Sequence, residues 1–137
     1  MEIITSISHK EMRKDIDWSD KTILIADDIY TNFLLLEAIL IDTRAKLIWA
    51  KNGMEAVAIC LDHENIDLVL MDIQMPEKNG IEATRDIKKI RKDLPIVAQT
   101  AYTEEFAENN IMEAGCSQII RKPIIPDLVI KTLATYL

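Results

Sequence analysis

Short apolar segments alternate along the chain with longer segments in which apolar residues recur every three or four positions. The short segments are rich in Ile, Val and Leu, and most are apolar throughout, as is typical of strands covered on both faces. Such strands are expected at residues 22–26, 46–50, 67–71, 96–99 and 118–121. The longer segments predict helices at residues 31–42, 53–63, 80–92, 103–114 and 126–137. This alternation indicates five β/α units and a parallel sheet.

The third predicted helix carries a clear apolar stripe. Its residues Ala83, Ile87, Ile90 and Leu94 are spaced by four, three and four positions, so we expect one face to contact the sheet. The fourth predicted helix has a similar stripe and is expected to end at Gly115, because glycine readily adopts the left-handed conformation found at helix ends.

The number of units limits the possible architecture. Five units are too few for a barrel, which needs eight, so right-handed crossovers should give an open three-layer sandwich. The simplest arrangement is the flavodoxin-like (βα)5 fold, with a parallel five-stranded sheet in the order 2-1-3-4-5. We predict this α/β fold for residues 21–137. Residues 1–20 keep no steady period and are interpreted as an N-terminal extension or linker.

Composition narrows the possible functions. The chain has 137 residues, 49% apolar and 28% charged, which suits one soluble domain. Its net charge of −7 argues against direct nucleic acid binding, which relies on clustered Lys and Arg. No apolar run is long enough for a membrane segment, and the N-terminus lacks a signal-peptide core, so a cytoplasmic location is predicted. Cys60 and Cys116 lack metal-site spacing and are interpreted as small core residues.

Polar side chains lie at the ends of four of the five predicted strands. Asp27 and Asp28 follow the first strand, and Asp72 follows the third. Thr100 follows the fourth strand, and Lys122 follows the fifth. Ligands of open α/β sheets bind beyond the carboxyl ends of the strands, near the point where the strand order reverses. Three carboxylates, one hydroxyl and one ammonium are therefore expected to converge at one edge.

This combination of groups has the parts needed for phosphoryl transfer. Three neighbouring carboxylates need a compensating cation, and Mg²⁺ prefers oxygen ligands. One carboxylate can act as nucleophile, while a metal ion, a lysine and a hydroxyl stabilise the phosphoryl oxygens. Taken singly, each residue is more easily explained as a strand cap, a turn residue or a surface lysine. Their joint placement favours a functional site.

Four strings carry a resemblance to a known family. They are ILIADD, LVLMDIQMPEKNGIEATRDI, PIVAQTA and GCSQIIRKPI. From about residue 21 to residue 137, the chain resembles the receiver domain of bacterial two-component response regulators, with these strings in the family's order and spacing. The third string is most similar to receivers of hybrid sensor histidine kinases.

The resemblance implies specific roles for the acidic residues. Asp72 would be the phosphoacceptor, taking a phosphoryl group from a phosphohistidine on a partner protein. Asp28, Asp72 and the backbone carbonyl of Gln74 would bind Mg²⁺, with Asp27 acting nearby through water.

Further roles follow for the polar residues of the last two strands. Thr100 and Lys122 would contact the phosphoryl oxygens, and the Lys122–Pro123 peptide bond would be cis. The domain would thus catalyse its own phosphorylation and dephosphorylation.

The chain also departs from the family pattern. Ile119 occupies a position where the family usually has Tyr or Phe, whose ring turns inward on activation. Tyr102, two residues after Thr100, could substitute for it or could control access of water. Gln99 lies where an apolar residue is more common. Whether Ile119 or Tyr102 takes part in switching is left open by the sequence.

The resemblance further implies a phosphorylation switch with protein partners. A sensor histidine kinase or a histidine phosphotransfer protein would supply or receive the phosphoryl group. A partner would contact the surface of the fourth helix, fifth strand and fifth helix, which could also form a homodimer. The chain would be either a stand-alone regulator or part of a hybrid histidine kinase.

Two alternatives remain in view. A phosphohydrolase of the haloacid dehalogenase type also uses an aspartate nucleophile with Mg²⁺, but it has a second Asp two residues later, where this chain has Gln74. A pseudo-receiver would keep the fold without phosphorylation, which the five intact family positions argue against. The segment SISHKEMRK faintly resembles a kinase histidine box, but His9 is interpreted as a linker residue.

Overall fold

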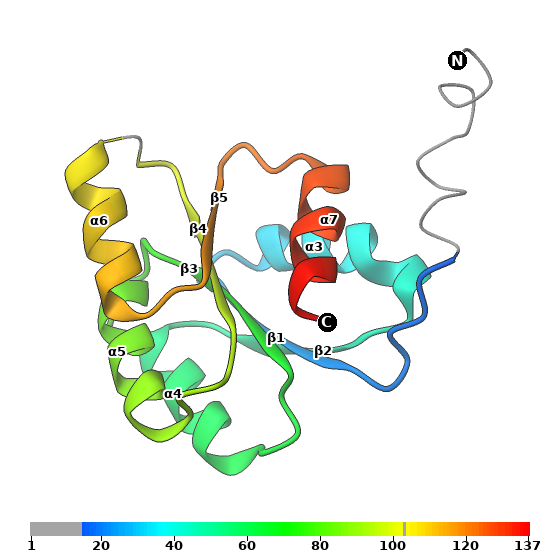
Figure 1. The fold of residues 1–137 in the computed structure, drawn as a ribbon, viewed down its shortest axis with the longest axis horizontal. Coiled ribbons are helices and arrows are strands. Elements are labelled where there is room, and N and C mark those ends of the chain that lie inside the picture. Colours follow the sequence, from blue (N-terminus) through cyan, green and yellow to red (C-terminus); the bar gives the residue numbers. More distant parts are fainter. Residues whose placement is uncertain (1–14, 103) are drawn as a thin grey trace.

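The computed structural model describes residues 15–102 and 104–137, which form one parallel sheet of five strands between two layers of helices (Figure 1). The sheet order is β2-β1-β3-β4-β5, which confirms the predicted flavodoxin-like topology. The strands are β1 (Thr22–Ala26), β2 (Lys46–Ala50), β3 (Leu68–Asp72), β4 (Ile96–Thr100) and β5 (Gln118–Arg121). The helices are α3 (Tyr30–Leu40), η1 (Ile41–Thr43), α4 (Gly53–Asp62), α5 (Gly80–Ile90), α6 (Glu105–Ala114) and α7 (Pro126–Tyr136).

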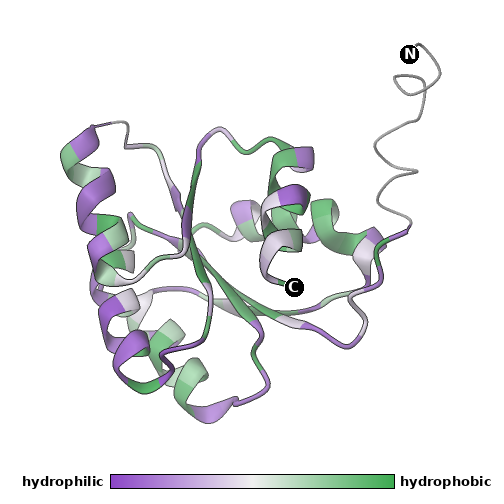
Figure 2. Cartoon of the chain, in the orientation of Figure 1, coloured by the Kyte–Doolittle hydropathy of each residue, from purple (hydrophilic) through white to green (hydrophobic). Residues whose placement is uncertain are grey.

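The two faces of the sheet belong to separate apolar cores. Helices α3 and α7 cover one face, and α4, α5 and α6 cover the other. Side chains alternate between the faces along each strand, so Ile23 and Ile25 of β1 join the core under α3 and α7, whereas Leu24 joins the other core. Strands β1, β3 and β4 are buried along their whole length, which explains why they are largely hydrophobic (Figure 2).

Local sequence signals explain how the helix ends are fixed. The side chain of Asn79 accepts a hydrogen bond from the backbone N–H of Glu82, and the Glu82 side chain accepts one from the backbone N–H of Asn79. This capping box fixes the start of α5, the helix that follows the loop after Asp72. Helix α6 ends at Gly115, which has a φ of 118°, as predicted for a left-handed helix cap.

The predicted apolar stripe of the third helix is only partly confirmed. Ala83 and Ile87 are buried, but Ile90 is 55% exposed, so its assignment to the sheet-facing side is wrong. Helix α5 ends at Ile90, and Leu94 reaches the core from the turn beyond it. Ile90 is the last residue of the helix and its side chain stays exposed there, whereas Leu94 is buried although the helical spacing no longer applies beyond Ile90.

The start of the described chain packs against the domain. Trp18 is buried in the core under α3 and α7, and its backbone N–H donates to the carbonyl oxygen of Thr43 over 2.7 Å. An ion pair of 2.9 Å joins Asp17 and Arg44 beside it. Residues 1–14, including His9, lie outside the described residues. In the described ranges, none of the helices has the length and apolar character needed to cross a membrane.

Candidate functional site

The acidic side chains predicted from the strand ends come together at the carboxyl edge of the sheet. Asp27 and Asp28 directly follow β1, and Asp72 is the last residue of β3, the neighbouring strand. Carboxylate oxygens of these three residues all lie within 4.8 Å of one another. The site therefore occupies the point between β1 and β3 where the strand order reverses.

Gly80 permits the chain after Asp72 to turn closely over this edge. A Cβ atom at Gly80 would lie 2.2 Å from the main-chain oxygen of Asp72, so no larger residue fits without a backbone shift. The N–H of Gly80 donates to the carbonyl oxygen of Ile73 over 3.0 Å. Helix α5 thus begins in direct contact with the end of β3.

Asp27 is the most enclosed of the three acids, with no exposed surface. Its Oδ1 atom accepts hydrogen bonds from the Ile29 N–H over 2.9 Å and from Asn32 Nδ2 over 3.4 Å. Its Oδ2 atom is buried and has no hydrogen-bond partner within residues 15–102 and 104–137. Burial raises the pKa of Asp27, because the charged form loses its contact with water.

Asp72 is also buried, and it has a positively charged neighbour. Its Oδ1 atom accepts from Lys122 Nζ over 3.3 Å and from the Gln74 N–H over 3.2 Å. Burial raises the pKa of Asp72 most strongly, and the charge of Asp27 adds to the increase, whereas Lys122 opposes it. Asp72 is therefore a carboxylate held in place by two donors in a poorly hydrated position.

The donor set fits a hard divalent cation. Three carboxylates supply only oxygen ligands, and the Oδ2 atom of Asp27 is a buried acceptor still without a partner in the described chain. Next to this cluster lies a cavity of about 410 Å³ whose lining includes Asp28, Gln74 and Tyr102. This edge therefore offers oxygen ligands for a small ion and space for a group bound to that ion.

Thr100 and Lys122 lie at the ends of the next two strands. Thr100 is fully buried, and its Oγ1 atom accepts a hydrogen bond from the Tyr102 N–H over 3.0 Å. The backbone N–H of Lys122 donates to the Thr100 carbonyl oxygen over 2.9 Å, and the Lys122–Pro123 peptide bond is cis. Ile119 instead packs, partly buried, against the core under α4, α5 and α6.

Two residues that the sequence interpretation missed also support the acidic cluster. Asn32 donates to Asp27 from the first turn of α3, and Trp49 donates from its indole Nε1 to the Asp27 carbonyl oxygen over 2.9 Å. The Trp49 ring also packs against Tyr30, with 4.7 Å between the ring centroids. The position of Asn32, five residues after Asp27 at a helix start, was a usable signal, whereas the Trp49 contact depends on the pairing of β1 with β2.

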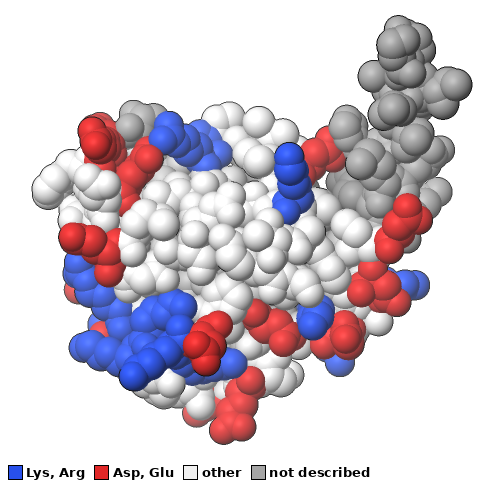
Figure 3. Space-filling model, in the orientation of Figure 1, with Lys and Arg blue, Asp and Glu red and all other residues white. Residues whose placement is uncertain are grey.

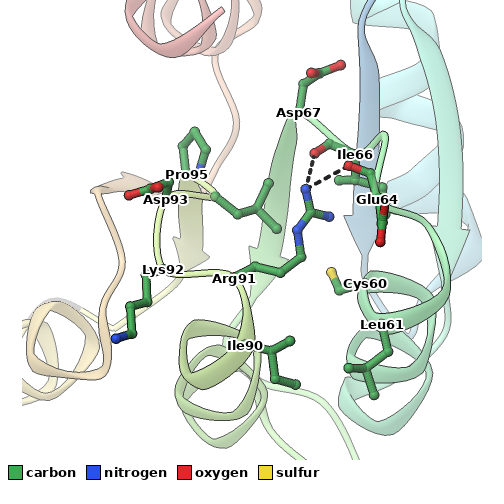
Figure 4. Close-up of a pocket in the computed structure, with 11 residues that line it drawn as sticks. Cys60, Leu61, Glu64, Ile66, Asp67, Ile90, Arg91, Lys92, Asp93 and Pro95 are labelled. Atoms are coloured by element: carbon green, nitrogen blue, oxygen red, sulfur yellow. Dashed lines mark hydrogen bonds between the residues drawn. The ribbon is translucent and has the colours of Figure 1, made fainter.

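A larger cavity, of about 580 Å³, lies at the opposite end of the sheet and has a different character (Figure 4). The side chain of Arg91 extends into it and donates to the carbonyl oxygens of Glu64 and Ile66 over 3.0 and 2.9 Å. Arg91 therefore holds the loop before β3 in place. The acidic cluster, although beside a smaller cavity, remains the stronger chemical site.

Basic residues gather near this second cavity, away from the acids. Five of the sixteen Lys and Arg residues lie within residues 85–92, and Figure 3 shows the resulting basic area over α5. Helix α5 starts against Asp72 and ends at Ile90, about 16 Å further along the helix, so these basic residues lie on the half of α5 that is farther from the acidic cluster and on the turn after it. None of these five basic residues forms the ion pair with Asp72, whose partner is Lys122.

The chain is similar in sequence to known signalling proteins. The chain is 34% identical over 119 residues to the polar-differentiation response regulator DivK of Brucella anthropi, a match that covers 85% of this chain and 96% of DivK. It is 38% identical over 103 residues to the autoinducer 2 sensor kinase/phosphatase LuxQ of Vibrio parahaemolyticus. That match covers 74% of this chain but only 12% of LuxQ.

The fold is also similar to solved structures of receiver domains. The receiver domain of the sensor histidine kinase PA1611 from Pseudomonas aeruginosa, with a magnesium ion in its active site cleft, matches with a TM-score of 0.78 and 26% identity, covering 85% of this chain and 96% of that one. The receiver domain of Ssk1 from Saccharomyces cerevisiae, solved with the histidine phosphotransfer protein Ypd1, matches with a TM-score of 0.79 and 27% identity, covering 85% and 88%. Residues 23–134 match the model of the response regulator receiver domain, and the chain belongs to this family of two-component signalling domains.

Proposed function

We propose that Asp72 is the phosphoacceptor of this receiver domain and that Mg²⁺ binds beside it. The observation that carries the proposal is the position of the Asp72 carboxylate, 3.3 Å from Lys122 Nζ and within 4.8 Å of two other carboxylates. Asp28, Asp72 and the backbone carbonyl of Gln74 would hold the ion, with Asp27 close by. When bound, Mg²⁺ neutralises charge on the phosphoryl oxygens and on the carboxylates.

The covalent step uses Asp72 as the nucleophile. A carboxylate oxygen of Asp72 attacks the phosphorus atom of a phosphohistidine, the phosphorus–nitrogen bond breaks, and the histidine ring leaves with the bonding electron pair. The product is an acyl phosphate on Asp72. The Lys122 ammonium is already beside Asp72 and can pair with a phosphoryl oxygen, and the Thr100 hydroxyl still has a proton to donate.

A partner that presents a phosphohistidine needs a surface next to this site. Ile29 and Tyr30 directly follow the acid pair and are 51% and 52% exposed, and Leu34 is 39% exposed one turn further along α3. Contiguous exposed apolar residues of this kind mark protein contact surfaces. We propose that a sensor histidine kinase or a histidine phosphotransfer protein docks here. A homodimer through α6, β5 and α7 is a separate prediction.

The two alternatives are less favoured. A phosphohydrolase of the haloacid dehalogenase type needs an acid two residues after its nucleophile, whereas Gln74 offers only an amide there. A pseudo-receiver would need no intact acceptor site, yet Asp27, Asp28 and Asp72 form a cluster, and Lys122 pairs with it. The site therefore supports phosphoryl acceptance better than either alternative.

Mass spectrometry after incubation with acetyl phosphate and Mg²⁺ tests the proposal. We expect one base-labile phosphoryl group per chain, absent from Asp72→Asn and retained in Glu37→Gln, which neutralises an exposed acid on α3. Steady phosphate release without modified protein would instead support a hydrolase. An unmodified wild-type chain without phosphate release would support a pseudo-receiver.

A further inference from the structure

The loop of residues 73–79 joins β3 to α5 at the edge of the sheet that holds the acidic cluster. Its base is fixed, because Ile73 and Met75 are buried in the core under α4, α5 and α6, and the Gly80 N–H donates to the Ile73 carbonyl oxygen over 3.0 Å. Its outer part is exposed at Glu77, which has a φ of 66°. A residue with a side chain keeps this left-handed conformation where surrounding contacts fix it. The outer part of the loop therefore needs support from elsewhere in the fold.

Helix α4 supplies this support through its first residue. The backbone N–H of Gly53 donates to the carbonyl oxygen of Lys78 over 3.1 Å. The N–H groups of a first helical turn have no partner within the helix, and the positive end of the helix dipole attracts a carbonyl oxygen. Lys78 also forms an ion pair with Asp86 of α5, with 2.6 Å between Nζ and Oδ2. Lys78 thus joins the loop to both helices, which lie side by side (Figure 1).

The contact with α4 requires a residue without a side chain at position 53. A Cβ atom on Gly53 would lie 2.1 Å from the carbonyl oxygen of Lys78 and 2.9 Å from its carbonyl carbon. These are backbone atoms, which cannot turn aside as the end of a flexible side chain can. Either the loop or α4 would have to move by about 0.9 Å before the closest approach reached 3.0 Å. Glycine is intrinsically less favourable than alanine in a helix, so this close approach, rather than helix formation, accounts for the glycine.

The supported loop carries one of the proposed metal ligands. Gln74, four residues before Lys78, has the backbone carbonyl proposed to bind Mg²⁺, and its N–H donates to Asp72 Oδ1 over 3.2 Å. Pro76 lies between Gln74 and Lys78, and its ring limits how freely the loop could absorb a shift. Mg²⁺ tolerates little departure from octahedral geometry at ligand distances of about 2.0–2.1 Å. A shift of the loop would therefore reach the metal site.

We propose that Gly53 is a positioning residue for the Mg²⁺ site. Because it has no side chain, the Lys78 carbonyl rests directly on the start of α4, and the loop keeps the Gln74 carbonyl in place for the ion. Gly53 acts through the loop and does not itself bind the metal. This inference rests on the proposed function, since it concerns the ion that the phosphoacceptor site would hold.

Calorimetric titration of Gly53→Ala with Mg²⁺ tests this role. Urea unfolding first establishes conditions in which the variant is fully folded, so that a loss of stability is not mistaken for a loss of affinity. We expect the dissociation constant for Mg²⁺ to rise roughly tenfold, as is typical when a residue that orients metal ligands is changed. A dissociation constant within about twofold of the wild-type value would overturn the inference.

Gly115→Ala provides the matched control. A Cβ atom on Gly115 would lie 2.8 Å from the Lys88 side chain, and its φ of 118° disfavours alanine, so this variant should also lose stability. Gly115 follows α6 and precedes β5, whereas the acidic cluster lies at the carboxyl ends of the strands. Its dissociation constant for Mg²⁺ should stay within about twofold of the wild-type value, because the two positions are independent. An equal loss of affinity in both variants would contradict a role specific to Gly53.

Hydrogen exchange of the wild type tests the same contact without a substitution. Coupling between two events is reciprocal, so Mg²⁺ must favour the contact between Gly53 and Lys78 as much as the contact favours Mg²⁺. Exchange of the Gly53 amide, followed by NMR, should slow roughly tenfold at saturating Mg²⁺. The His63 amide, which donates to the Ile59 carbonyl oxygen at the other end of α4, should change little. Equal slowing of both amides, or none at Gly53, would overturn the inference even where Gly53→Ala fails to fold.

A crystal structure of metal-free Gly53→Ala shows which part moves. The Lys78 carbonyl and the Gln74 backbone should be displaced together, whereas a loop that stays in place while α4 moves away would contradict the inference. Failure of the proposed function has a different outcome. A wild-type chain that binds no Mg²⁺ refutes the metal site itself, whereas Mg²⁺ binding that is indifferent to the change at position 53 refutes only the role of Gly53.

Discussion

Neutralising Asp27 should stabilise the protein when no metal ion is present. The change Asp27→Asn keeps the shape of the side chain and its Oδ1 acceptor, and it removes one charge from a cluster of three carboxylates. Two unit charges 4.8 Å apart repel each other by about 3.5 kcal/mol at an effective dielectric constant of 20, and by about 0.9 kcal/mol in water. The hydrogen bonds from Ile29 and Asn32 to Oδ1 weaken when the acceptor is neutral, which offsets about 1 kcal/mol. We therefore expect a net gain of about 1–2 kcal/mol.

Urea unfolding with EDTA at neutral pH measures this gain. The matched control is Glu37→Gln, which makes the same charge change at an exposed position and should alter stability by less than about 0.5 kcal/mol. Millimolar Mg²⁺ should stabilise the wild type and have a smaller effect on Asp27→Asn. An Asp27→Asn protein that is less stable than the wild type in EDTA would refute the repulsion on which the estimate depends.

Protonation of Asp27 and Asp72 should also stabilise the metal-free protein, as Asp27→Asn is expected to do. Burial raises the pKa of Asp27 and of Asp72 above the value of 3.8 expected in the unfolded chain. The folded protein therefore binds these protons more tightly, and stability without metal rises as the pH falls through the raised pKa values. This gain is complete below about pH 3.8. Asp17 and Asp86, whose pKa values are lowered by hydrogen bonds from Ser19 and Lys78, contribute the opposite trend near that pH.

Three further predictions concern the surroundings of the site. Gly80→Ala should reduce the free energy of unfolding by about 2–3 kcal/mol in urea experiments, because its Cβ atom overlaps the backbone of β3. Trp49→Phe should lose about 1 kcal/mol of stability and weaken Mg²⁺ binding measured by calorimetry, because it removes the donor to the Asp27 carbonyl oxygen. Cys60 and Cys116 should resist iodoacetamide at pH 7.5 until the protein is unfolded, since burial raises the pKa of each thiol to about 11.

Much of the fold and the position of the acidic cluster could be predicted because they depend on local patterns. The apolar segments gave strand limits within one residue, and the strand ends then placed Asp27, Asp28 and Asp72 at one edge. Parallel topology made this possible, because it brings the carboxyl ends of all strands to the same side. The pairing of Lys122 with Asp72 follows from the same rule.

Other contacts depend on how distant segments pack and leave no periodic signal. Trp18 and Ile16 alternate with charged residues in a stretch without a sustained period, so nothing in the pattern indicated that Trp18 would pack beside Thr43. The exposure of Ile90 depends on where α5 ends, which spacing alone did not determine. Neither polar atom of the Gln99 side chain has a hydrogen-bond partner among the described residues, and this depends on how β3, β4 and β5 pack, which the sequence pattern does not show.

The two tryptophans lie at different ends of α3, so their intrinsic fluorescence can report on two parts of the protein. Trp49 is bonded to the acidic loop through Asp27 and packs against Tyr30 at the start of α3. Trp18 is buried beyond the other end of α3, beside Thr43, about one helix length away. Fluorescence from Trp49 can thus report changes at the acidic cluster, and fluorescence from Trp18 can report whether residues 15–18 stay packed against the domain. Single replacement of either tryptophan by Phe would allow both signals to be followed independently in unlabelled protein.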